Sequence, residues 1–289
     1  MGRIEITEAV AAALGTPVRS ARPVHGGDVA RAFRVTLDDG TVVFAKTHDD
    51  PPPGFFTTEA AGLAWLADAG AVPVPGVLAV GDAPDDVPLL VLEWIDVRHG
   101  ADLDERAFGV GLAHLHAAGA PCFGRMDRRP TGSRQLPNDP CDTWAEFYAA
   151  RRLLPLVRLA RDSDAVDPDV LAGVERIAAD LDTYGAADVA AARLHGDLWA
   201  GNRVVDRSGV SWLIDPAAHG GHPEFDLAMM DLFGGFGPDA LAAYHEVAPP
   251  LDGWERRRPL HQLAPLLVHA IKFGGPYPRA TAAAVAALG

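Results

Sequence analysis

Apolar residues occur in short alternating or continuous runs over the first hundred positions of the chain. Such runs predict strands, because successive side chains of a strand point to opposite faces of a sheet. They cover residues 18–24, 32–37, 41–46, 72–80 and 89–95. Asp38-Asp39-Gly40 is a strong tight-turn signal between two of them. With helices predicted over 4–14 and 55–68, this part indicates a small antiparallel sheet with one main helix.

The rest of the chain has the three- and four-residue spacing of apolar positions that is typical of helices. Helices are predicted over residues 105–118, 144–160, 170–184, 240–246, 254–273 and 279–288. Residues 121–142 have little periodicity and contain several Gly, Pro and Arg residues, and a loop of this length in a compact domain is often functional. The hydrophobic pattern therefore predicts an α+β protein whose strands precede most of its helices.

Length, charge and cysteine content exclude several classes of protein. The chain has 289 residues, enough for one large domain or two lobes, and 48% of them are hydrophobic. A net charge of −14 argues against a nucleic-acid partner and against an anionic membrane surface. No apolar run has the length of a signal sequence or a membrane span, so we expect a cytoplasmic protein. Cys122 and Cys141 are interpreted as incidental thiols rather than a disulfide or zinc site.

The candidate chemistry is concentrated in the stretch RLHGDLWAGN at residues 193–202 and in the Asp-Pro pair that begins at residue 215. Asn202 lies five residues after Asp197, and Asp215 lies thirteen after Asn202, at the end of an apolar run. Kinase catalytic loops have a base Asp, a metal-binding Asn five residues later, and another metal-binding Asp after the next strand. The alternative is a pair of ordinary turns, since Asp, Asn and Gly are common in turns. The ordered set favours phosphoryl transfer, with Asp197 as the base and Asn202 and Asp215 as oxygen ligands of Mg²⁺.

Residues in the first part of the chain complete the expected ATP site. Lys46 ends the strand-like run VFAK, as does the kinase lysine that contacts the α- and β-phosphates. Glu59, in the following helix, is the natural ionic partner of that lysine. The alternatives are a surface lysine at a strand end and a glutamate favoured by the helix dipole. Gly26 and Gly27 form a turn that lets the backbone approach phosphates closely, or else a plain hairpin turn.

A buried strand runs into a polar segment at Glu93, Trp94 and Ile95. In a two-lobed kinase this is the position of the hinge, whose backbone groups bind the edge of the adenine ring. The predicted organisation is an ATP-binding lobe over residues 1–92, a hinge over 93–98, and a helical catalytic and substrate lobe over 99–289.

Three histidines and one aspartate are assigned structural or open roles. His114 and His116 are two apart in a predicted helix, so they point to different faces and are interpreted as structural rather than as a metal pair. Asp226 lies in the first turn of a predicted helix and is expected to brace the loops below the active site. For His219, beside glycines in a predicted loop, a substrate contact and a plain loop role both remain open.

The chain resembles the fructosamine kinases, also called ketosamine-3-kinases, within the aminoglycoside- and choline-kinase-like group. The motifs that carry the resemblance are LHGDLWAGN at 194–202, DPA at 215–217, GHPEFDLA at 221–228 and FGGF at 233–236. WAEFY at 144–148 and LLVH at 266–269 extend it over nearly the whole chain. Trp199 after the HGDL run favours this family, because other small-molecule kinases share only the His-Gly-Asp and the Asn. The Gly-rich turn lacks the cysteine that several relatives carry there for redox-sensitive pairing.

The resemblance implies a two-lobed protein-kinase-like fold, with a small N-terminal lobe and a larger, mostly helical C-terminal lobe. It implies ATP-dependent phosphorylation of the third-carbon hydroxyl of a ketosamine, such as a fructosamine or a ribulosamine, and hence deglycation of amines or proteins. By motif match, Trp199 would line the sugar pocket, and Lys46 and Glu59 would hold the phosphates. The expected partner is a small-molecule ketosamine or a glycated amine or protein, bound by a monomer.

Two other functions remain open from the sequence. A kinase with another acceptor, such as an aminoglycoside, an amino alcohol or a free sugar, would keep the same motifs. A catalytically silent nucleotide-binding regulator belongs to a different class of protein. The presence of all four residues Lys46, Asp197, Asn202 and Asp215 argues against it, because silent kinases usually lose at least one of them.

Overall fold

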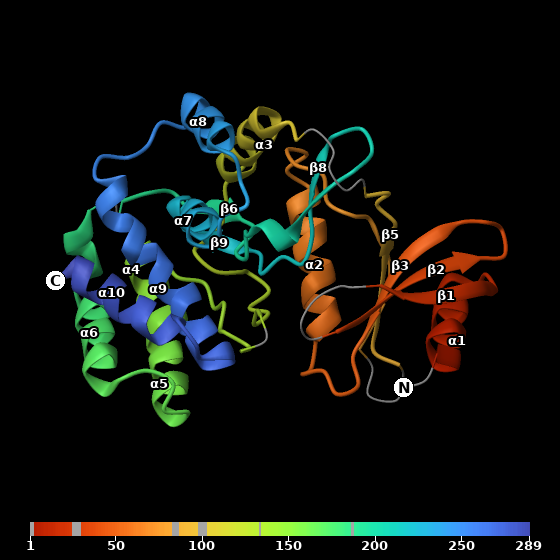
Figure 1. Ribbon diagram of the computed structural model, residues 1–289, viewed down its shortest axis with the longest axis horizontal. Coiled ribbons are helices and arrows are strands. Elements are labelled where there is room, and N and C mark those ends of the chain that lie inside the picture. The colour runs from red at the N-terminus through yellow and green to blue at the C-terminus, as the bar shows by residue number, and fades with distance from the viewer. Residues whose placement is uncertain (1–2, 25–29, 83–86, 98–102, 133, 186–187) are drawn as a thin grey trace. The chain divides into compact units, whose positions relative to one another are not determined.

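The computed structural model of the protein describes residues 3–24, 30–82, 87–97, 103–132, 134–185 and 188–289 (Figure 1). These residues group into two compact units. The first, called the N unit, comprises residues 1–104 and 203–216, and the second, called the C unit, comprises residues 105–202 and 217–289. The chain therefore returns to the N unit for a short segment after building the first part of the C unit.

The N unit contains a five-stranded antiparallel sheet with the strand order β1-β2-β3-β5-β4 (Figure 1). Its strands are β1 (Val18–Val24), β2 (Arg31–Leu37), β3 (Val42–Thr47), β4 (Val77–Gly81) and β5 (Leu89–Glu93). Two helices accompany the sheet, α1 (Arg3–Leu14) and α2 (Phe55–Ala67). The antiparallel sheet and the main helix predicted from the hydrophobic pattern are confirmed.

The two helices cover opposite faces of the sheet. Val10 of α1 lies in one buried cluster with Ala45 of β3, and Phe56 of α2 lies in a second cluster with Phe44 of the same strand. Neighbouring residues of β3 therefore point to different helices, as the two-residue period of a strand requires. Because Lys46 has the same parity as Phe44, its side chain emerges on the face that α2 covers.

A two-stranded hairpin, β7 (Arg203–Val205) and β8 (Ser211–Leu213), brings the chain back to the N unit. The N–H of Leu213 donates a 2.9 Å hydrogen bond to the carbonyl of Pro73, which joins β8 to the segment before β4. In the turn, hydrogen bonds from the side chains of Ser208 and Trp212 lower the pKa of Asp206 to about 2. This hairpin sets the position of the residues that follow it, including Asp215.

The C unit is mostly helical. Its helices are α3 (Glu105–Ala117), α4 (Trp144–Phe147), the π-helix η1 (Tyr148–Leu153), α5 (Leu154–Asp162), α6 (Pro168–Ala179), the 3-10 helices η2 (Leu181–Tyr184) and η3 (Ala200–Asn202), α7 (Glu224–Phe233), α8 (Pro238–Val247), α9 (Trp254–Phe273) and α10 (Tyr277–Leu288). The helix predicted over residues 144–160 is thus continuous but contains a π-helical segment, and the one predicted over 170–184 ends earlier and continues as a 3-10 turn.

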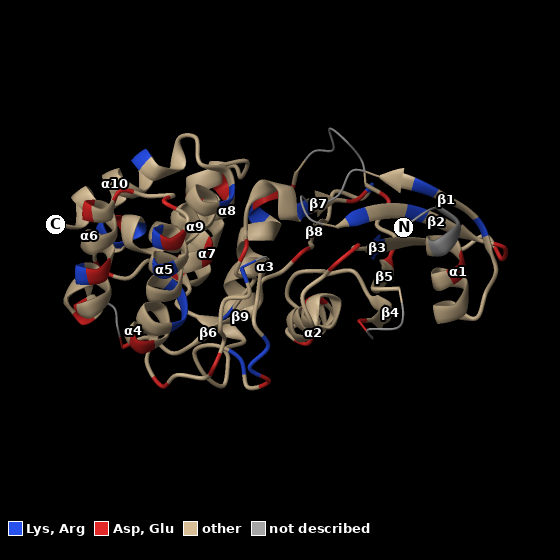
Figure 2. Cartoon of the chain, turned by 90° about the horizontal axis from the view of Figure 1, so that it is seen from below, with Lys and Arg blue, Asp and Glu red and all other residues tan. Residues whose placement is uncertain are grey.

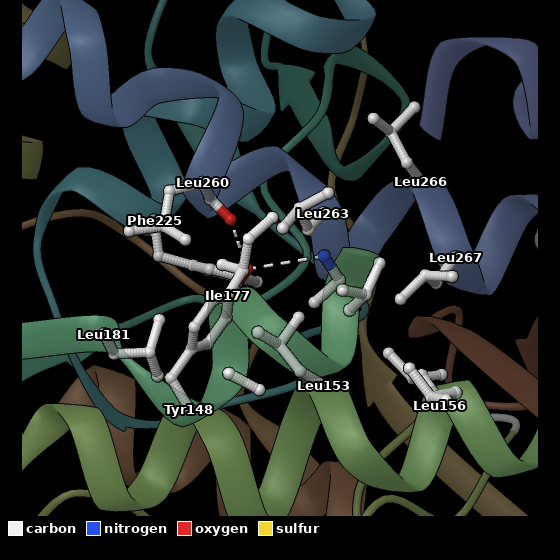
Figure 3. Packing of buried hydrophobic residues seen from close by; sticks show 14 of the residues in the cluster. Tyr148, Leu153, Leu156, Ile177, Leu181, Phe225, Leu260, Leu263, Leu266 and Leu267 are labelled. Carbon is white, nitrogen blue, oxygen red and sulfur yellow. Dashed lines mark hydrogen bonds between the residues drawn. The ribbon is translucent and has the colours of Figure 1, made fainter. Parts of the chain in front are cut away.

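The core of the C unit forms around the π-helical segment and α9 (Figure 3). Tyr148 is buried, with 1% of its surface exposed, and its hydroxyl donates to the carbonyl of Leu260 at 2.7 Å. Figure 3 shows this hydroxyl pointing to the backbone of α9 among apolar side chains that include Leu153, Ile177 and Leu263. A buried phenol is therefore satisfied by a carbonyl, as burial of a polar group requires.

A short strand at residues 219–221 was not expected, because the sequence predicted a loop there. In the structure β6 (Ala192–Leu194) pairs antiparallel with β9 (His219–Gly221), and Gly220 exchanges two 2.8 Å backbone hydrogen bonds with Gly124. A Cβ atom at Gly220 would lie 2.0 Å from the carbonyl oxygen of Cys122. The glycines that suggested a loop instead allow backbones to approach closely, which is another reason for glycine in a strand.

Acidic and basic residues are interspersed along the helices and strands of both units rather than separated by sign (Figure 2). In the C unit, for example, Arg161 of α5 pairs with Glu175 of α6 at 2.7 Å. Among the described residues, none of the helices is long and apolar enough to cross a membrane. The cytoplasmic location expected from the sequence stays a prediction.

Candidate active site

Three predicted residues come together in the N unit around a buried ammonium group. Lys46, at the end of β3, is 5% exposed, and its Nζ donates to Oε1 of Glu59 at 2.8 Å. The same Nζ contacts Oδ1 of Asp215, which follows β8. Since Glu59 is 13 residues from Lys46 and Asp215 is 169 residues away, only the folded sheet, helix and hairpin bring these charges together.

The charges of this cluster do not balance. Burial alone would lower the pKa of Lys46, but the attraction of the carboxylates of Glu59 and Asp215 outweighs burial and raises it. Lys46 therefore stays positively charged at neutral pH. Burial also raises the pKa of Glu59, and repulsion from Asp215 adds to that effect against the attraction of Lys46. One ammonium thus serves two carboxylates, and a further cation would be favoured beside them.

Asp215 has a left-handed backbone, with φ of 54°. This region is uncommon for a residue other than glycine and costs free energy that the surrounding structure must supply. Such strain is typical of functional sites, where it sets the direction of a side chain. Here it accompanies the carboxylate that contacts Lys46, while 27% of the Asp215 side chain remains exposed.

The helix that carries Glu59 is capped by a residue that no local sequence signal identifies. Gly54, which precedes α2, has no side chain to satisfy the first N–H groups of the helix. Asp82, just after β4, accepts the N–H of Phe56 at 3.2 Å and that of Thr57 at 2.6 Å. Asp82 is therefore the N-terminal cap of α2, supplied from 26 residues away along the chain.

In the C unit, the side chain of Asn202 is bound to the residue predicted as the base. Its Nδ2 donates to the carbonyl oxygen of Asp197 at 2.8 Å and to Oδ2 of the same residue at 3.0 Å. Asn202 is 6% exposed. Because the amide nitrogen is engaged with Asp197, the amide oxygen is the ligand atom that Asn202 offers to a metal ion.

The loop that holds Asp197 is anchored from below by Asp226 of α7. Asp226 is completely buried and accepts the N–H of His195 at 2.8 Å and that of Gly196 at 2.9 Å. Gly196 has φ of 81°, and a Cβ there would lie 2.2 Å from the carbonyl oxygen of Ala217, so the loop requires glycine at this point. The bracing role expected for Asp226 is confirmed.

The two predicted substrate residues have different environments. Trp199 is 42% exposed, and its indole covers Gly201 so closely that a Cβ there would lie 2.2 Å from the ring. His219 is buried beside Phe147, and its Nδ1 donates to the carbonyl of Ala217 at 2.9 Å. Burial lowers the pKa of His219 to about 3, so the ring is neutral at pH 7. Trp199 is accessible to a ligand, whereas His219 belongs to the packed interior.

His222, Glu224 and His261 have ligand atoms within 4.8 Å of one another, which is a possible metal-binding arrangement. Most of their polar atoms have partners, although Nδ1 of the buried His261 has none among the described residues. Glu224 accepts both Nε and Nη2 of Arg257, at 2.9 and 2.6 Å, and Nε2 of His261 at 3.1 Å. Nδ1 of His222 accepts the N–H of Glu224 at 3.1 Å. A guanidinium on the same carboxylate disfavours a metal ion, so the cluster is interpreted as an ionic link between α7 and α9.

The predicted hinge residues lie at the end of β5 in the N unit. The N–H of Glu93 donates to the carbonyl of Gly76 at 2.8 Å, and the side chain of Trp94 stacks against the guanidinium of Arg34 at 5.2 Å. The carbonyl of Ile95 accepts the N–H of Val97 at 3.0 Å. Gly26 and Gly27, predicted to approach the phosphates, lie outside the described residues.

Comparison with known proteins identifies the family of the chain. The sequence model of the fructosamine kinase family matches residues 4–288. The mouse ketosamine-3-kinase is 30% identical over 87% of this chain and 89% of its own length. The protein-ribulosamine 3-kinase of Arabidopsis thaliana is 31% identical over 91% of this chain and 80% of its own length.

Solved structures extend the comparison to the fold. A crystal structure from Thermobifida fusca, described as a candidate fructosamine-3-kinase, has a TM-score of 0.88 at 39% identity and covers 98% of each chain. A thermostable mutant of aminoglycoside phosphotransferase APH(4)-Ia has a TM-score of 0.66 at 14% identity. The match covers 98% of this chain and 97% of that chain and is a likeness of fold alone.

The fold and the relatives define a phosphotransferase with a kinase-like fold. Within that class, the chain belongs to the fructosamine kinase family. The predicted family, the α+β kinase-like fold and the enzyme class, an ATP-dependent phosphotransferase with an alcohol group as acceptor, are therefore confirmed. Phosphorylation of ketosamines is the activity for which the family is named, so the predicted activity is confirmed at the level of the family.

Proposed function

We propose that this protein transfers the γ-phosphoryl group of ATP to the third-carbon hydroxyl of a ketosamine and that Asp197 is the base. The observation that carries the proposal is the pair of hydrogen bonds from Asn202 to Asp197, at 2.8 and 3.0 Å. This pair holds a carboxylate next to an amide whose oxygen is suited to a metal ion, which is the combination that phosphoryl transfer needs.

Mg²⁺ would be held by Asn202 and Asp215. Both residues offer the hard oxygen ligands that Mg²⁺ prefers. The engagement of the Asn202 amide nitrogen and the unbalanced negative charge around Lys46 both support a cation at these residues. When bound, the metal ion would neutralise charge on the β- and γ-phosphates.

Lys46 would contact the α- and β-phosphates, and Glu59 would hold its ammonium group in place. The adenine edge would bind to the backbone at the end of β5. Because the N–H of Glu93 is already bonded to Gly76, we assign this contact to the backbone of Trp94 and Ile95. A contact between the phosphates and the turn at Gly26 and Gly27 stays a prediction from the sequence.

The acceptor sugar would stack on the exposed indole of Trp199. For His219 we propose the structural role, since its ring is buried and its Nδ1 is bonded to Ala217. The natural acceptor would be a free ketosamine or a glycated amine or protein, bound by a monomer without a nucleic-acid or membrane partner.

The proposed reaction is direct in-line transfer without a phosphoenzyme. Asp197 orients the sugar hydroxyl and accepts its proton as the oxygen attacks the γ-phosphorus. The bond from that phosphorus to the bridging oxygen of ADP breaks as the new bond forms. Most of the catalysis comes from positioning and from charge stabilisation, as in other phosphoryl transfers.

The test is ATP consumption with Mg²⁺ on a ribulosamine, a fructosamine, free sugars, choline and an aminoglycoside, with Asp197→Asn as the control. We expect turnover on the ketosamines and a loss of about 100- to 10,000-fold in kcat for Asp197→Asn, with ATP binding nearly unchanged. Turnover on another acceptor would remove the substrate assignment but keep the reaction. Unchanged turnover of Asp197→Asn would refute the base, and ATP binding without turnover would favour a regulator.

A further inference from the structure

Hydrogen bonds connect the buried carboxylate of Asp226 to two other helices of the C unit, on the side away from the catalytic loop. Oδ2 of Asp226 accepts a hydrogen bond from the N–H of His195 and a second one from Nε2 of His116, at 3.2 Å. Nδ1 of His116 lies 2.8 Å from the hydroxyl of Tyr244. His116 belongs to α3 and Tyr244 to α8, and both are 4% exposed.

The chemistry of these groups fixes the direction of each hydrogen bond. A buried carboxylate only accepts, so Nε2 of His116 must carry the proton that faces Asp226. In a neutral ring, Nδ1 is then an acceptor, and the hydroxyl of Tyr244 donates to it. The contact with Tyr244 holds the ring with its Nε2 toward Asp226. Burial, with the nearby charge of Asp226, raises the pKa of Tyr244 and keeps the hydroxyl as a donor.

The helices that carry the two residues are in close contact. A Cβ at Gly109 of α3 would lie 2.0 Å from the carbonyl oxygen of Ala240 in α8, so these backbones touch. Phe108 and Phe236 stack beside this contact at 5.5 Å. Close packing of this kind leaves the ring of His116 little room to rotate, and the edge contact between the rings of His116 and Tyr244 adds to that restriction.

We propose that His116 and Tyr244 are positioning residues for catalysis: they hold the Asp226 carboxylate in the orientation that anchors the backbone before Asp197. The proposal rests on the proposed function, in which Asp197 is the base. Without the Nε2–H donor, Oδ2 of Asp226 loses one of its partners, and the N–H groups of His195 and Gly196 have a less firmly held acceptor. Asp197, the next residue, then loses its position relative to the hydroxyl that it deprotonates.

The first experiment compares kcat and KM for His116→Leu, His116→Gln and Tyr244→Phe, with kcat expressed per ATP-binding site. We expect His116→Leu to lose about 10- to 100-fold in kcat, because small displacements of a catalytic group are costly. The KM for ATP should stay within about twofold, since Lys46 and Glu59 belong to the N unit. Gln can still donate from a nitrogen near the position of Nε2, so His116→Gln should recover most of kcat.

Two variants serve as matched controls. His114→Gln changes an exposed histidine of the same helix, and Tyr184→Phe removes a hydroxyl that donates to Leu288 elsewhere in the C unit. Both should keep the kinetic constants of the unaltered protein. A His116→Leu protein that keeps kcat within about twofold would overturn the proposal. So would one whose total activity falls only in proportion to its number of ATP-binding sites.

The order of action is tested by combining substitutions. Tyr244→Phe alone should lower kcat by about threefold, but it should add nothing to His116→Leu, because Tyr244 acts through the ring of His116. Additive losses would contradict that order and assign Tyr244 an independent structural role.

Hydrogen exchange separates this proposal from the proposed function. The amides of His195 and Gly196 should exchange about tenfold faster in His116→Leu than in the unaltered protein, and no faster in Tyr184→Phe. This measurement needs no substrate. If the unaltered protein phosphorylates no ketosamine, the proposed function fails, while unchanged amide exchange in His116→Leu would overturn the positioning proposal on its own.

Discussion

The N unit buries a cation between two carboxylates, whereas the C unit buries a carboxylate among N–H donors. Lys46 lies between Glu59 and Asp215, and Asp226 accepts from His195, Gly196 and His116. Both arrangements satisfy the rule that a buried charge must be paired or hydrogen-bonded. They differ in the kind of partner: side chains in the first case, and mainly backbone groups in the second.

This difference separates a binding site from a scaffold. Backbone N–H groups cannot change partners without moving the loop, so the fully buried Asp226 fixes one conformation. The carboxylate of Asp215 is on a side chain with 27% exposure and shares one ammonium with Glu59, so it can exchange partners. A cluster with excess negative charge is suited to accept a cation that arrives with a nucleotide, while Asp226 is suited to hold the catalytic loop still.

The largest expected effect on this contrast comes from removing the buried cation. Lys46→Met leaves two carboxylates side by side without an ammonium, and we expect the N unit to lose about 3 kcal/mol of stability at pH 7. Glu59, whose pKa is already raised, would then take up a proton more readily. Because the folded variant binds that proton more tightly than the unfolded chain, its deficit should shrink as the pH is lowered toward 5.

Urea unfolding at several pH values measures this effect, together with loss of ATP binding. Lys272→Met is the matched control, because Lys46 and Lys272 are the only lysines in the sequence and Lys272 lies in the last turn of α9. A Lys46→Met protein whose deficit is independent of pH would show that Glu59 and Asp215 do not share the ammonium in the way described.

The stability that Glu224 contributes to the C unit should depend on pH in the opposite direction. Burial would raise the pKa of Glu224, but hydrogen bonds from His261 and Arg257 outweigh it and lower the pKa from 4.5 to about 2. Glu224 therefore contributes stability above pH 4.5, and this contribution is lost as the pH falls toward 2. Glu224→Gln should be less stable at pH 7 and should lose this dependence on acid.

Thermal unfolding between pH 7 and pH 2 compares the two proteins. Glu246→Gln is the control, because Glu246 also pairs with an arginine, Arg106, but on the surface, where 56% of its side chain is exposed. Surface pairs contribute little, so the control should follow the unaltered protein. Parallel curves for Glu224→Gln and the unaltered protein would contradict the assigned role of Glu224.

The smallest effect is expected from the cap of α2. Asp82→Ala should cost about 1 kcal/mol, the usual loss for an N-terminal cap, and should raise the KM for ATP a few-fold because α2 carries Glu59. Asp68→Ala, at the other end of the same helix, is the matched control and should be neutral or slightly stabilising, since an acid opposes the dipole there. Equal loss of stability in both variants would rule out the capping role.

Much of this organisation was predictable from local sequence. The runs at residues 32–37 and 41–46 predicted β2 and β3, with Lys46 at the end of the second run. The spacing of Asp197, Asn202 and Asp215 by itself indicated phosphoryl transfer. These features are encoded within a few residues of one another, where the geometry of strands and turns translates directly into a pattern.

Other features left no such pattern. No local signal identified Asp82 as a helix cap, His116 was interpreted as structural without a partner, and residues 219–221 were predicted as a loop. Their partners are distant in sequence: His116 and Asp226 are 110 residues apart, and Glu224 and Arg257 are 33 apart. A hydrogen bond between residues so far apart leaves no periodic pattern in the sequence.

The sequence by itself determined the family, the element types and the identity of the chemical groups, because spacing within a loop and periodicity within an element are local properties. Only the tertiary structure decided which of those groups form ion pairs and which groups hold others in place by hydrogen bonds. That decision belongs to packing, because a buried charge is stable only where distant segments bring it the right partners.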